Sequence, residues 1–86
     1  MTYVLTLLSA AQRDLARLPS KARYAVWKEL RRLEDDPRHR GVRPVRSQPG
    51  WLRARVGELR VVFVIDDRER RVMVRRIVRR DKAYQQ

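Results

Sequence analysis

The stretch Trp51-Leu52-Arg53-Ala54-Arg55-Val56-Gly57-Glu58-Leu59-Arg60-Val61-Val62-Phe63-Val64-Ile65 decides the fold. Two runs of strand-forming residues flank Gly57-Glu58, and a Gly-X pair in that position is typical of a two-residue type II′ hairpin turn. If Val56 faces Leu59, the register follows: Arg55 faces Arg60, and Leu52 faces Phe63. Because side chains alternate between the two sides of a strand, one side of this hairpin is apolar. That side consists of Leu52, Ala54, Val56, Leu59, Val61, Phe63 and Ile65.

The other side of the predicted hairpin carries Arg53, Arg55 and Arg60. Like charges directly opposite one another on neighbouring strands destabilise a sheet by up to about 1 kcal/mol. Two interpretations are open. The arginines extend into water from an exposed face, or a phosphate group of a ligand normally lies between them. The second interpretation predicts an anion-binding site.

The residues before the hairpin predict a strand and two helices. Residues 3–8 are rich in strand formers, and Ser9 and Gln12 have the spacing of a capping box that opens a helix running to Pro19. Ser20 can cap a second helix, which Asp35-Asp36-Pro37 ends. The apolar residues follow at helical spacing: Ala11, Leu15 and Leu18 in the first helix, and Ala22, Val26, Leu30 and Leu33 in the second.

The remaining segments complete a single domain of 86 residues. Residues 38–50 hold glycines and prolines without any period, which indicates a loop. We therefore expect a strand at 1–8, a helical hairpin at 9–37, a loop at 38–50, antiparallel strands at 51–78 and a polar tail at 79–86. The predicted fold class is α+β, with two layers: a sheet of about four strands, formed by the N-terminal strand and a three-stranded meander, packs on the helical hairpin. Among the large aromatics, Tyr24, Trp27 and Phe63 are expected in the core, and Trp51 as a half-buried anchor for the loop before it.

The charge of the chain is strongly positive and unevenly distributed. Lys and Arg number 22 against 10 for Asp and Glu, which gives +12. Residues 1–37 carry seven basic and five acidic residues, whereas residues 38–86 carry fifteen and five. A codon bias explains an excess of Arg over Lys, but it does not explain this asymmetry. The pattern predicts a basic face that binds a polyanion, nucleic acid in particular.

Several kinds of site are excluded by composition. The chain has no cysteine, which rules out disulfides, thiolate nucleophiles and zinc sites built on Cys. His39 is the single histidine, and between Arg38 and Arg40 it is expected to be a solvated loop residue. No metal or cofactor is expected. The longest apolar run, 61–65, is too short to span a bilayer, and the N-terminus lacks a signal-peptide pattern, so the protein is expected in the cytoplasm without membrane contact.

The third strand of the meander has two possible phases relative to the second. One phase adds Arg75 and Arg79 to the face of Arg60, and the other adds Arg76 and Arg80. Either phase extends the basic face, so the expectation of an electrostatic footprint does not depend on the choice.

Tyr84 lies in the tail, directly after several charged residues. A tyrosine next to a basic face can stack on a nucleobase, which contributes about 1–3 kcal/mol per base. The alternative is a tail tyrosine that packs on the edge of the domain.

The order and spacing of these elements resemble the RelE/ParE toxin superfamily of bacterial type II toxin–antitoxin systems. The resemblance covers nearly the whole chain. It rests on the strand at 3–8, on Ala11-Gln12-Arg13-Asp14-Leu15, on Leu33-Glu34-Asp35-Asp36-Pro37, and above all on the hairpin from Trp51 to Phe63. The ending Arg79-Arg80-Asp81-Lys82-Ala83-Tyr84 is similar to the basic-plus-tyrosine ending of the RelE branch.

This resemblance implies a metal-independent endoribonuclease that cuts mRNA at the ribosome and is neutralised by a cognate antitoxin. Arg60 would take the position of the arginine that stabilises the reacting phosphate, and Arg53 and Arg55 the positions of two basic residues on the preceding strand. Tyr84 would stack on or activate the nucleotide, and the C-terminal arginine of the family would fall on Arg79 or Arg80. The implied catalytic set is Arg60, Tyr84, Arg55 and Arg80, and the implied RNA contacts are Arg53, Arg79, Lys82 and Arg46. The antitoxin would cover the helices and the basic face with acidic or amphipathic segments.

Two other functions remain open at this point. The ParE branch of the same fold poisons DNA gyrase and is no nuclease, and its members generally lack the paired strand bases and the terminal tyrosine. Arg53, Arg55 and Tyr84 therefore favour the ribonuclease branch. A nucleic-acid-binding module without catalysis would show a steep salt dependence of binding but no product.

Overall fold

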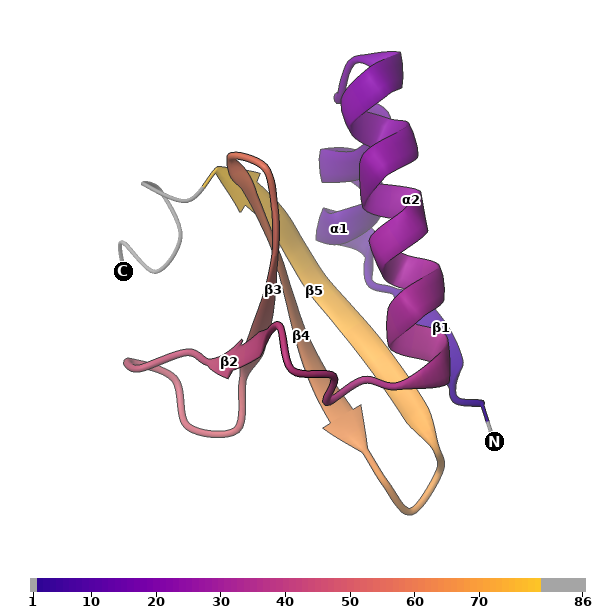
Figure 1. Ribbon diagram of the computed structural model, residues 1–86, viewed down its shortest axis with the longest axis vertical. Coiled ribbons are helices and arrows are strands. Elements are labelled where there is room, and N and C mark those ends of the chain that lie inside the picture. The colour runs from indigo at the N-terminus through magenta and orange to yellow at the C-terminus, as the bar shows by residue number, and fades with distance from the viewer. Residues whose placement is uncertain (1, 80–86) are drawn as a thin grey trace.

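Two helices cover one face of a five-stranded sheet in the computed structural model, which describes residues 2–79 (Figure 1). The helices are α1 (Ser9–Ala16) and α2 (Ser20–Asp35), and the strands are β1 (Val4–Leu7), β2 (Val42–Pro44), β3 (Leu52–Val56), β4 (Leu59–Asp66) and β5 (Arg71–Arg79). The predicted two-layer α+β architecture is therefore confirmed. The helical hairpin lies between the first two strands in sequence but packs on a sheet made mostly from the C-terminal half.

The strand order is β1-β5-β4-β3-β2, with β1 parallel to β5 and every other pair antiparallel. The expected sheet had about four strands, and the fifth is β2, which lies inside the predicted loop at 38–50. This strand pairs with β3 over only three residues, Val42 opposite Ala54 through Pro44 opposite Leu52. A three-residue edge strand that ends in proline is too short to show alternation in the sequence. It forms because the free edge of β3 offers backbone groups that need partners.

The central hairpin has the register predicted from its sequence. Leu52 lies opposite Phe63, and Arg55 lies opposite Arg60. Gly57 has a φ of +58°, whereas Glu58 does not have a positive φ. This is the backbone pattern of a type II′ turn, in which only the first central residue needs a positive φ.

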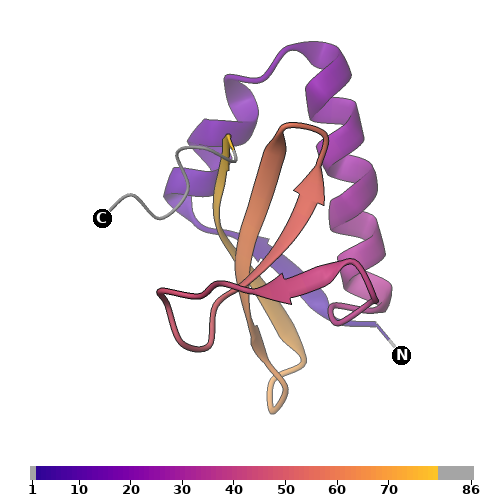
Figure 2. The ribbon, with the colours of Figure 1, turned by 60° about the vertical axis from the view of Figure 1, so that its left-hand side comes forward.

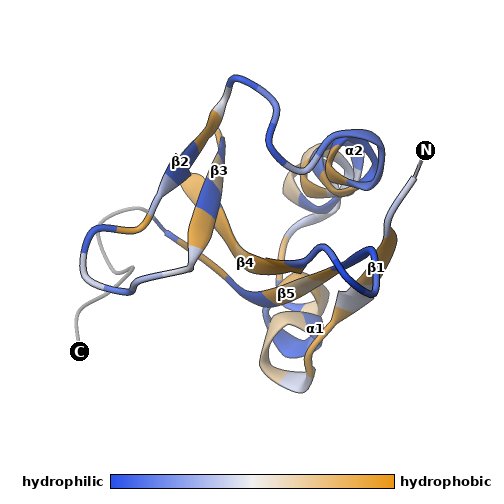
Figure 3. Ribbon diagram, turned by 90° about the horizontal axis from the view of Figure 1, so that it is seen from below, coloured by the Kyte–Doolittle hydropathy of each residue, from blue (hydrophilic) through white to orange (hydrophobic). Residues whose placement is uncertain are grey.

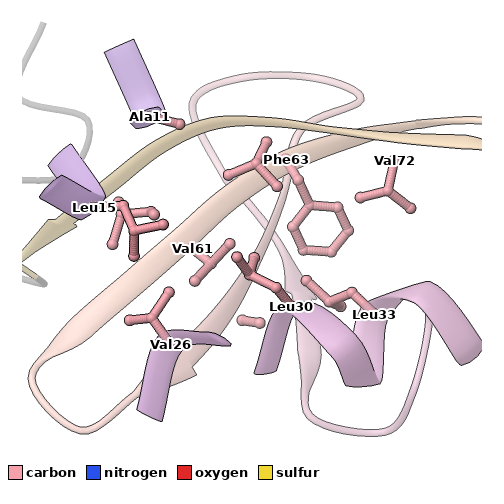
Figure 4. Close-up of a cluster of buried hydrophobic side chains, with 11 residues drawn as sticks. Ala11, Leu15, Val26, Leu30, Leu33, Val61, Phe63 and Val72 are labelled. Carbon is pink, nitrogen blue, oxygen red and sulfur yellow. The ribbon is translucent and has the colours of Figure 1, made fainter. Parts of the chain in front are cut away.

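The core lies between the helices and the apolar side of the sheet (Figure 4). Phe63, Val61 and Ala54 are fully buried there, as the alternation predicts, and they meet Val26 and Leu30 of α2. Burial of a phenylalanine side chain stabilises a fold by about 1.5–3 kcal/mol. This packing fixes which side of the hairpin faces inward and therefore which side faces solvent.

The ends of α1 differ from the prediction. Ser9 is the first helical residue and makes no capping hydrogen bond, so the expected capping box is wrong. Gln12 does reach back, but its Nε2 donates to the carbonyl oxygen of Leu7 at 2.9 Å. The helix ends at Ala16, three residues before Pro19, with Arg17 as its C-cap.

Helix α2 ends at Asp35 as expected, but its aromatic residues lie outside the core. It begins at Ser20, which makes no capping bond. Tyr24 is 68% exposed and Trp27 is 42% exposed, so their assignment to the core is wrong. The buried stripe of the helix is formed by the aliphatic residues Val26, Leu30 and Leu33, and Tyr24 and Trp27 fall beside it.

The side chain of His39 is largely covered and bonded, which corrects the expectation of a solvated loop residue. Its side chain is 8% exposed, and Nε2 lies 2.6 Å from Oε2 of Glu29 on α2. The backbone N–H of Gly41 donates to Nδ1 at 3.0 Å, so Nε2 carries the proton that is shared with Glu29. The pair ties the segment before β2 to α2, and it thereby helps to hold β2 at the edge of the sheet.

Candidate nucleic-acid interface

The face of the sheet away from the helices carries a group of arginines that we call the basic face. Figure 2 looks toward this face, with both helices behind the sheet. It comprises Arg43 on β2, Arg53 and Arg55 on β3, Arg60 on β4, and Arg75 and Arg76 on β5. The structure therefore brings together Arg53, Arg55 and Arg60 as the alternation predicts.

Two pairs of arginines lie directly opposite one another across strand boundaries. Arg55 is the partner of Arg60, and Arg43 is the partner of Arg53. Arg43 was missed because β2 itself was missed, and no signal in the sequence would have placed it. Such pairs repel one another, and the arginines stay together because the opposite side of the same strands is locked into the core.

Strand β5 changes phase relative to β4 part-way along its length. Arg75 has the first of the two predicted phases, and Arg76 has the second. Phe63 pairs with Val74 and Val62 pairs with Arg76, so Arg75 is the extra residue of a β-bulge. Val72 and Val74 before the bulge and Ile77 after it are all buried in the core. The bulge therefore places both Arg75 and Arg76 on the basic face.

The same shift removes Arg79 from the basic face. Arg79 pairs with Leu59, whose side chain packs against the core. It lines an apolar groove on the helix side of the sheet together with Leu18 and Ala22. Of the two phases left open, the one that adds Arg79 to the face of Arg60 therefore does not hold at Arg79, and the cause is a bulge that the sequence does not reveal.

One arginine of the basic face is neutralised by a carboxylate. Arg76 Nε donates to Oδ2 of Asp14 on α1 at 2.7 Å, and the backbone N–H of Ile77 donates to the same oxygen at 2.9 Å. The hydrogen bond to Asp14 raises the pKa of Arg76 above its usual value. Asp14 thus closes the part of the β5 edge that lies beyond the last residue paired with β1, Val74.

Two valines outside the core cluster are also buried. Val62 lies opposite Arg53 and Arg76, yet it is only 2% exposed, and Val45 in the loop before β3 is 3% exposed. Figure 3 shows this loop on the side of the sheet away from the helices. Trp51 holds the loop closed, since its carbonyl oxygen accepts from the N–H of Val45 at 2.9 Å. Trp51 is half-buried, as predicted for an anchor.

The guanidinium of Arg75 lies over the ring of Trp51, with Cζ 4.4 Å from the ring centroid. Arg46 lies exposed in the loop that Trp51 closes.

Within the described part of the chain, no three His, Cys, Asp or Glu side chains gather where they could hold a metal ion. Neither helix of residues 2–79 has the length and apolar character needed to cross a membrane.

Comparison with known proteins identifies the family. Residues 5–84 match the family model of the ParE toxin of type II toxin–antitoxin systems, parDE. The chain belongs to the RelE/ParE toxin superfamily. It is 39% identical over 84 residues to Toxin RelE of Mycobacterium tuberculosis, a match that covers 95% of this chain and 86% of the relative.

Solved structures of the RelE/ParE superfamily share the fold. The RelBE2 toxin–antitoxin complex of Mycobacterium tuberculosis matches with a TM-score of 0.81 at 30% identity, over 93% of this chain and 100% of that one. The archaeal RelE–RelB complex of Pyrococcus horikoshii matches with a TM-score of 0.81 at 22% identity, over 96% of this chain and 100% of that one. At that lower identity the likeness concerns the fold alone.

Three residues that the RelE resemblance singles out lie outside the residues that the structure describes. They are Arg80, Lys82 and Tyr84. For this RelE/ParE chain, the described part of the candidate site is therefore the basic face, with Arg55 and Arg60 at its centre.

Proposed function

We propose that this toxin is a metal-independent endoribonuclease that cuts mRNA at the ribosome and so inhibits translation in the cytoplasm. The observation that carries the proposal is the direct opposition of Arg55 and Arg60 on the sheet face away from the helices, with Arg53 on the same face. Arginines on directly opposite positions of two paired strands can both reach one phosphate, whose charge would relieve their repulsion. The relative called Toxin RelE, at 39% identity, supports the ribonuclease branch.

The proposed chemistry needs little from the protein beyond charge and position, because RNA supplies its own nucleophile. The 2′-OH attacks the adjacent phosphorus and a new bond forms between the 2′ oxygen and phosphorus, while the bond to the 5′ oxygen of the next nucleotide breaks. The products are a 2′,3′-cyclic phosphate and a free 5′-OH. Arg60 and Arg55 stabilise the additional negative charge on the phosphorane, with Arg53 as a further contact.

Proton transfer requires another group, since an arginine pKa above about 12 makes a poor base. In our proposal the proton leaving the 2′-OH and the proton reaching the 5′ oxygen are exchanged with Tyr84 or with ribosomal RNA. Arg80 and Lys82 would complete the positive surroundings. Free RNA is accordingly cut slowly or not at all.

A cognate antitoxin is the second proposed partner, with acidic or amphipathic segments that cover the helices. Tyr24 and Trp27 are large aromatics exposed on α2. An apolar groove of about 500 Å³ lies between the start of α2 and the tip of the β3–β4 hairpin, lined by Ala25 and Leu59 among others. Both features suit the apolar face of an amphipathic helix. The solved relative from Mycobacterium tuberculosis is itself a toxin–antitoxin complex.

The test is primer extension on a defined mRNA, with and without programmed ribosomes. We expect the wild type to give ribosome-dependent cuts and Arg60→Ala to lose them. Arg31→Ala, which removes an exposed arginine on α2, is the matched control and should cut like the wild type. Intact mRNA under both conditions would refute the proposal.

Gyrase poisoning is the second candidate, because the family model that matches the chain is that of the ParE toxin. The same preparation is therefore assayed for inhibition of plasmid supercoiling by DNA gyrase. Inhibition of supercoiling together with uncut mRNA would place the chain in the ParE branch. In that case the arginines of the basic face would have to be assigned another role.

A further inference from the structure

The stack of Arg75 on Trp51 joins two strands that are not neighbours. Trp51 directly precedes β3 and Arg75 belongs to β5, while β4 lies between them. The guanidinium carbon lies 4.4 Å from the centroid of the indole ring, so the arginine reaches across β4 on the basic face. The planar guanidinium and the planar indole ring thus stack beside the other arginines of the basic face.

The bulge in β5 is what makes this stack possible. Without the extra residue, either Arg75 or Arg76 would lie on the basic face, but not both. With it, Arg76 turns to Asp14 and Arg75 is left to lie over Trp51. In residues 2–79, Arg75 is therefore the arginine of β5 on the basic face that lies over an aromatic ring and has no carboxylate bonded to it.

The position of the stack fits a nucleotide chain that already touches the arginines. Trp51 precedes Arg53 by two residues and Arg55 by four on the same strand, which corresponds to about 7 Å and about 13 Å. These are distances that one or two nucleotides span. Arginine guanidinium planes and aromatic rings are the groups on which unpaired bases stack in single-stranded RNA.

We propose that Arg75, held by Trp51, forms a binding site for one nucleobase of a single-stranded RNA whose phosphates lie on Arg53, Arg55 and Arg60. The inference rests on the proposed function, because it takes RNA as the ligand of the basic face. It adds a second kind of contact: the arginines at the centre bind phosphates of any sequence, and the stack binds a base. Trp51 is a positioning residue here, and Arg75 is the residue that touches the base.

The experiment separates stacking from charge. The probe is a fluorescein-labelled RNA hexamer with 2′-O-methyl riboses, which cannot be cut by 2′-O attack, and its affinity is measured by fluorescence anisotropy. A second hexamer carries the same phosphates but abasic riboses. Arg75→Lys keeps the charge and removes the planar group, and Arg31→Lys is the matched control on α2.

We expect Arg75→Lys to bind the base-containing hexamer about five- to tenfold more weakly than the wild type, in line with the loss of one stacked base. Binding of the abasic hexamer should be the same for both proteins, and Arg31→Lys should match the wild type with both probes. In a Trp27→Phe background, where Trp51 is the single tryptophan, the base-containing hexamer should also change the tryptophan emission. Far-UV circular dichroism and a thermal melt show that Arg75→Lys is folded.

Equal binding of the base-containing hexamer by Arg75→Lys and the wild type would overturn the inference, and the stack would then be a structural contact alone. If Arg60→Ala still weakens binding of both hexamers in that case, the proposed function stands without it. If the wild type binds neither hexamer, the inference fails, and primer extension with programmed ribosomes decides the ribonuclease proposal separately.

Discussion

Asp14 satisfies an otherwise open stretch of sheet edge, and its replacement by alanine is expected to destabilise the fold by about 2–3 kcal/mol. Its side chain is 10% exposed and accepts two bonds from Arg76, at 2.7 and 3.2 Å, and one from the N–H of Ile77 at 2.9 Å. Ile77 is 3% exposed, so its N–H has little access to water once Asp14 is gone. An unpaired buried N–H costs about 1–3 kcal/mol. The ion pair adds less than about 1 kcal/mol, because Arg76 is half-exposed and screened by solvent.

Urea unfolding of the purified chain, followed by circular dichroism, measures this effect. For a domain of this size the free energy of unfolding falls by about 1 kcal/mol per molar urea, so the midpoint should drop by about 2–3 M in Asp14→Ala. Asp14→Asn keeps an oxygen that can accept from Ile77, and we expect about half of the loss. Asp35→Ala, at the exposed end of α2, is the control and should leave the midpoint unchanged within about 0.5 M.

The two Asp14 variants also separate the possible causes. If Asp14→Asn were as destabilised as Asp14→Ala, the charge of the carboxylate and not the bond to Ile77 would dominate. A midpoint shift below about 0.5 M in Asp14→Ala would refute the reasoning, because it would mean that the edge of β5 is satisfied without this side chain.

Two other contacts and one turn give outcomes that unfolding measurements can check. His39→Ala leaves Glu29 buried without its 2.6 Å partner and should lower the free energy of unfolding by about 2 kcal/mol; a loss below about 0.5 kcal/mol would contradict the buried pair. The hydrogen bond from Arg38 lowers the pKa of Asp67, so this contact stabilises the fold above about pH 4 and is lost as the pH falls through the depressed pKa. The melting temperature of the wild type should therefore exceed that of Asp67→Asn at pH 7, and the gap should close in acid; a gap independent of pH would exclude the linkage. Gly57→Ala should cost about 1 kcal/mol, since a φ of +58° strains any side chain although open space surrounds the Cβ position, and an unchanged urea midpoint would argue against that turn.

The parts of the fold that the sequence predicts correctly are those specified by residues close together in the chain. The register of β3 and β4 follows from the Gly57 turn and from strict alternation on either side of it. The end of α2 follows from Asp36-Pro37, because a proline disfavours helical conformation in the residue before it. Local steric rules decide both features, so no tertiary information is needed.

The parts that sequence reasoning misses depend on groups far apart in the chain. The bulge at Arg75 is followed by Arg76, whose guanidinium donates to Asp14, 62 residues away in the chain. Strand β2 depends on the open edge of β3, and the burial of His39 depends on Glu29. Periodicity in one segment carries no information about such partners. The exposure of Tyr24 and Trp27 has the same origin: aliphatic residues already fill the stripe of α2 that meets the sheet.

The candidate site shows why its arginines were easier to predict than its shape. The cluster exists because one side of β3 and β4 is fixed in the core, so that each alternate residue must point the other way. A sheet of this kind holds Arg55 and Arg60 on opposite positions at a cost in stability, and their backbone positions cannot separate without taking Phe63 and Val61 out of the core. The distribution of charge around that pair is a different matter. It is set by a bulge, by a carboxylate from α1 and by a tryptophan at the end of a loop, and these decide that Arg76 is neutralised while Arg75 lies over an aromatic ring. In our proposal, alternation therefore sets where a phosphate would bind, and the long-range contacts set which arginine would meet a base.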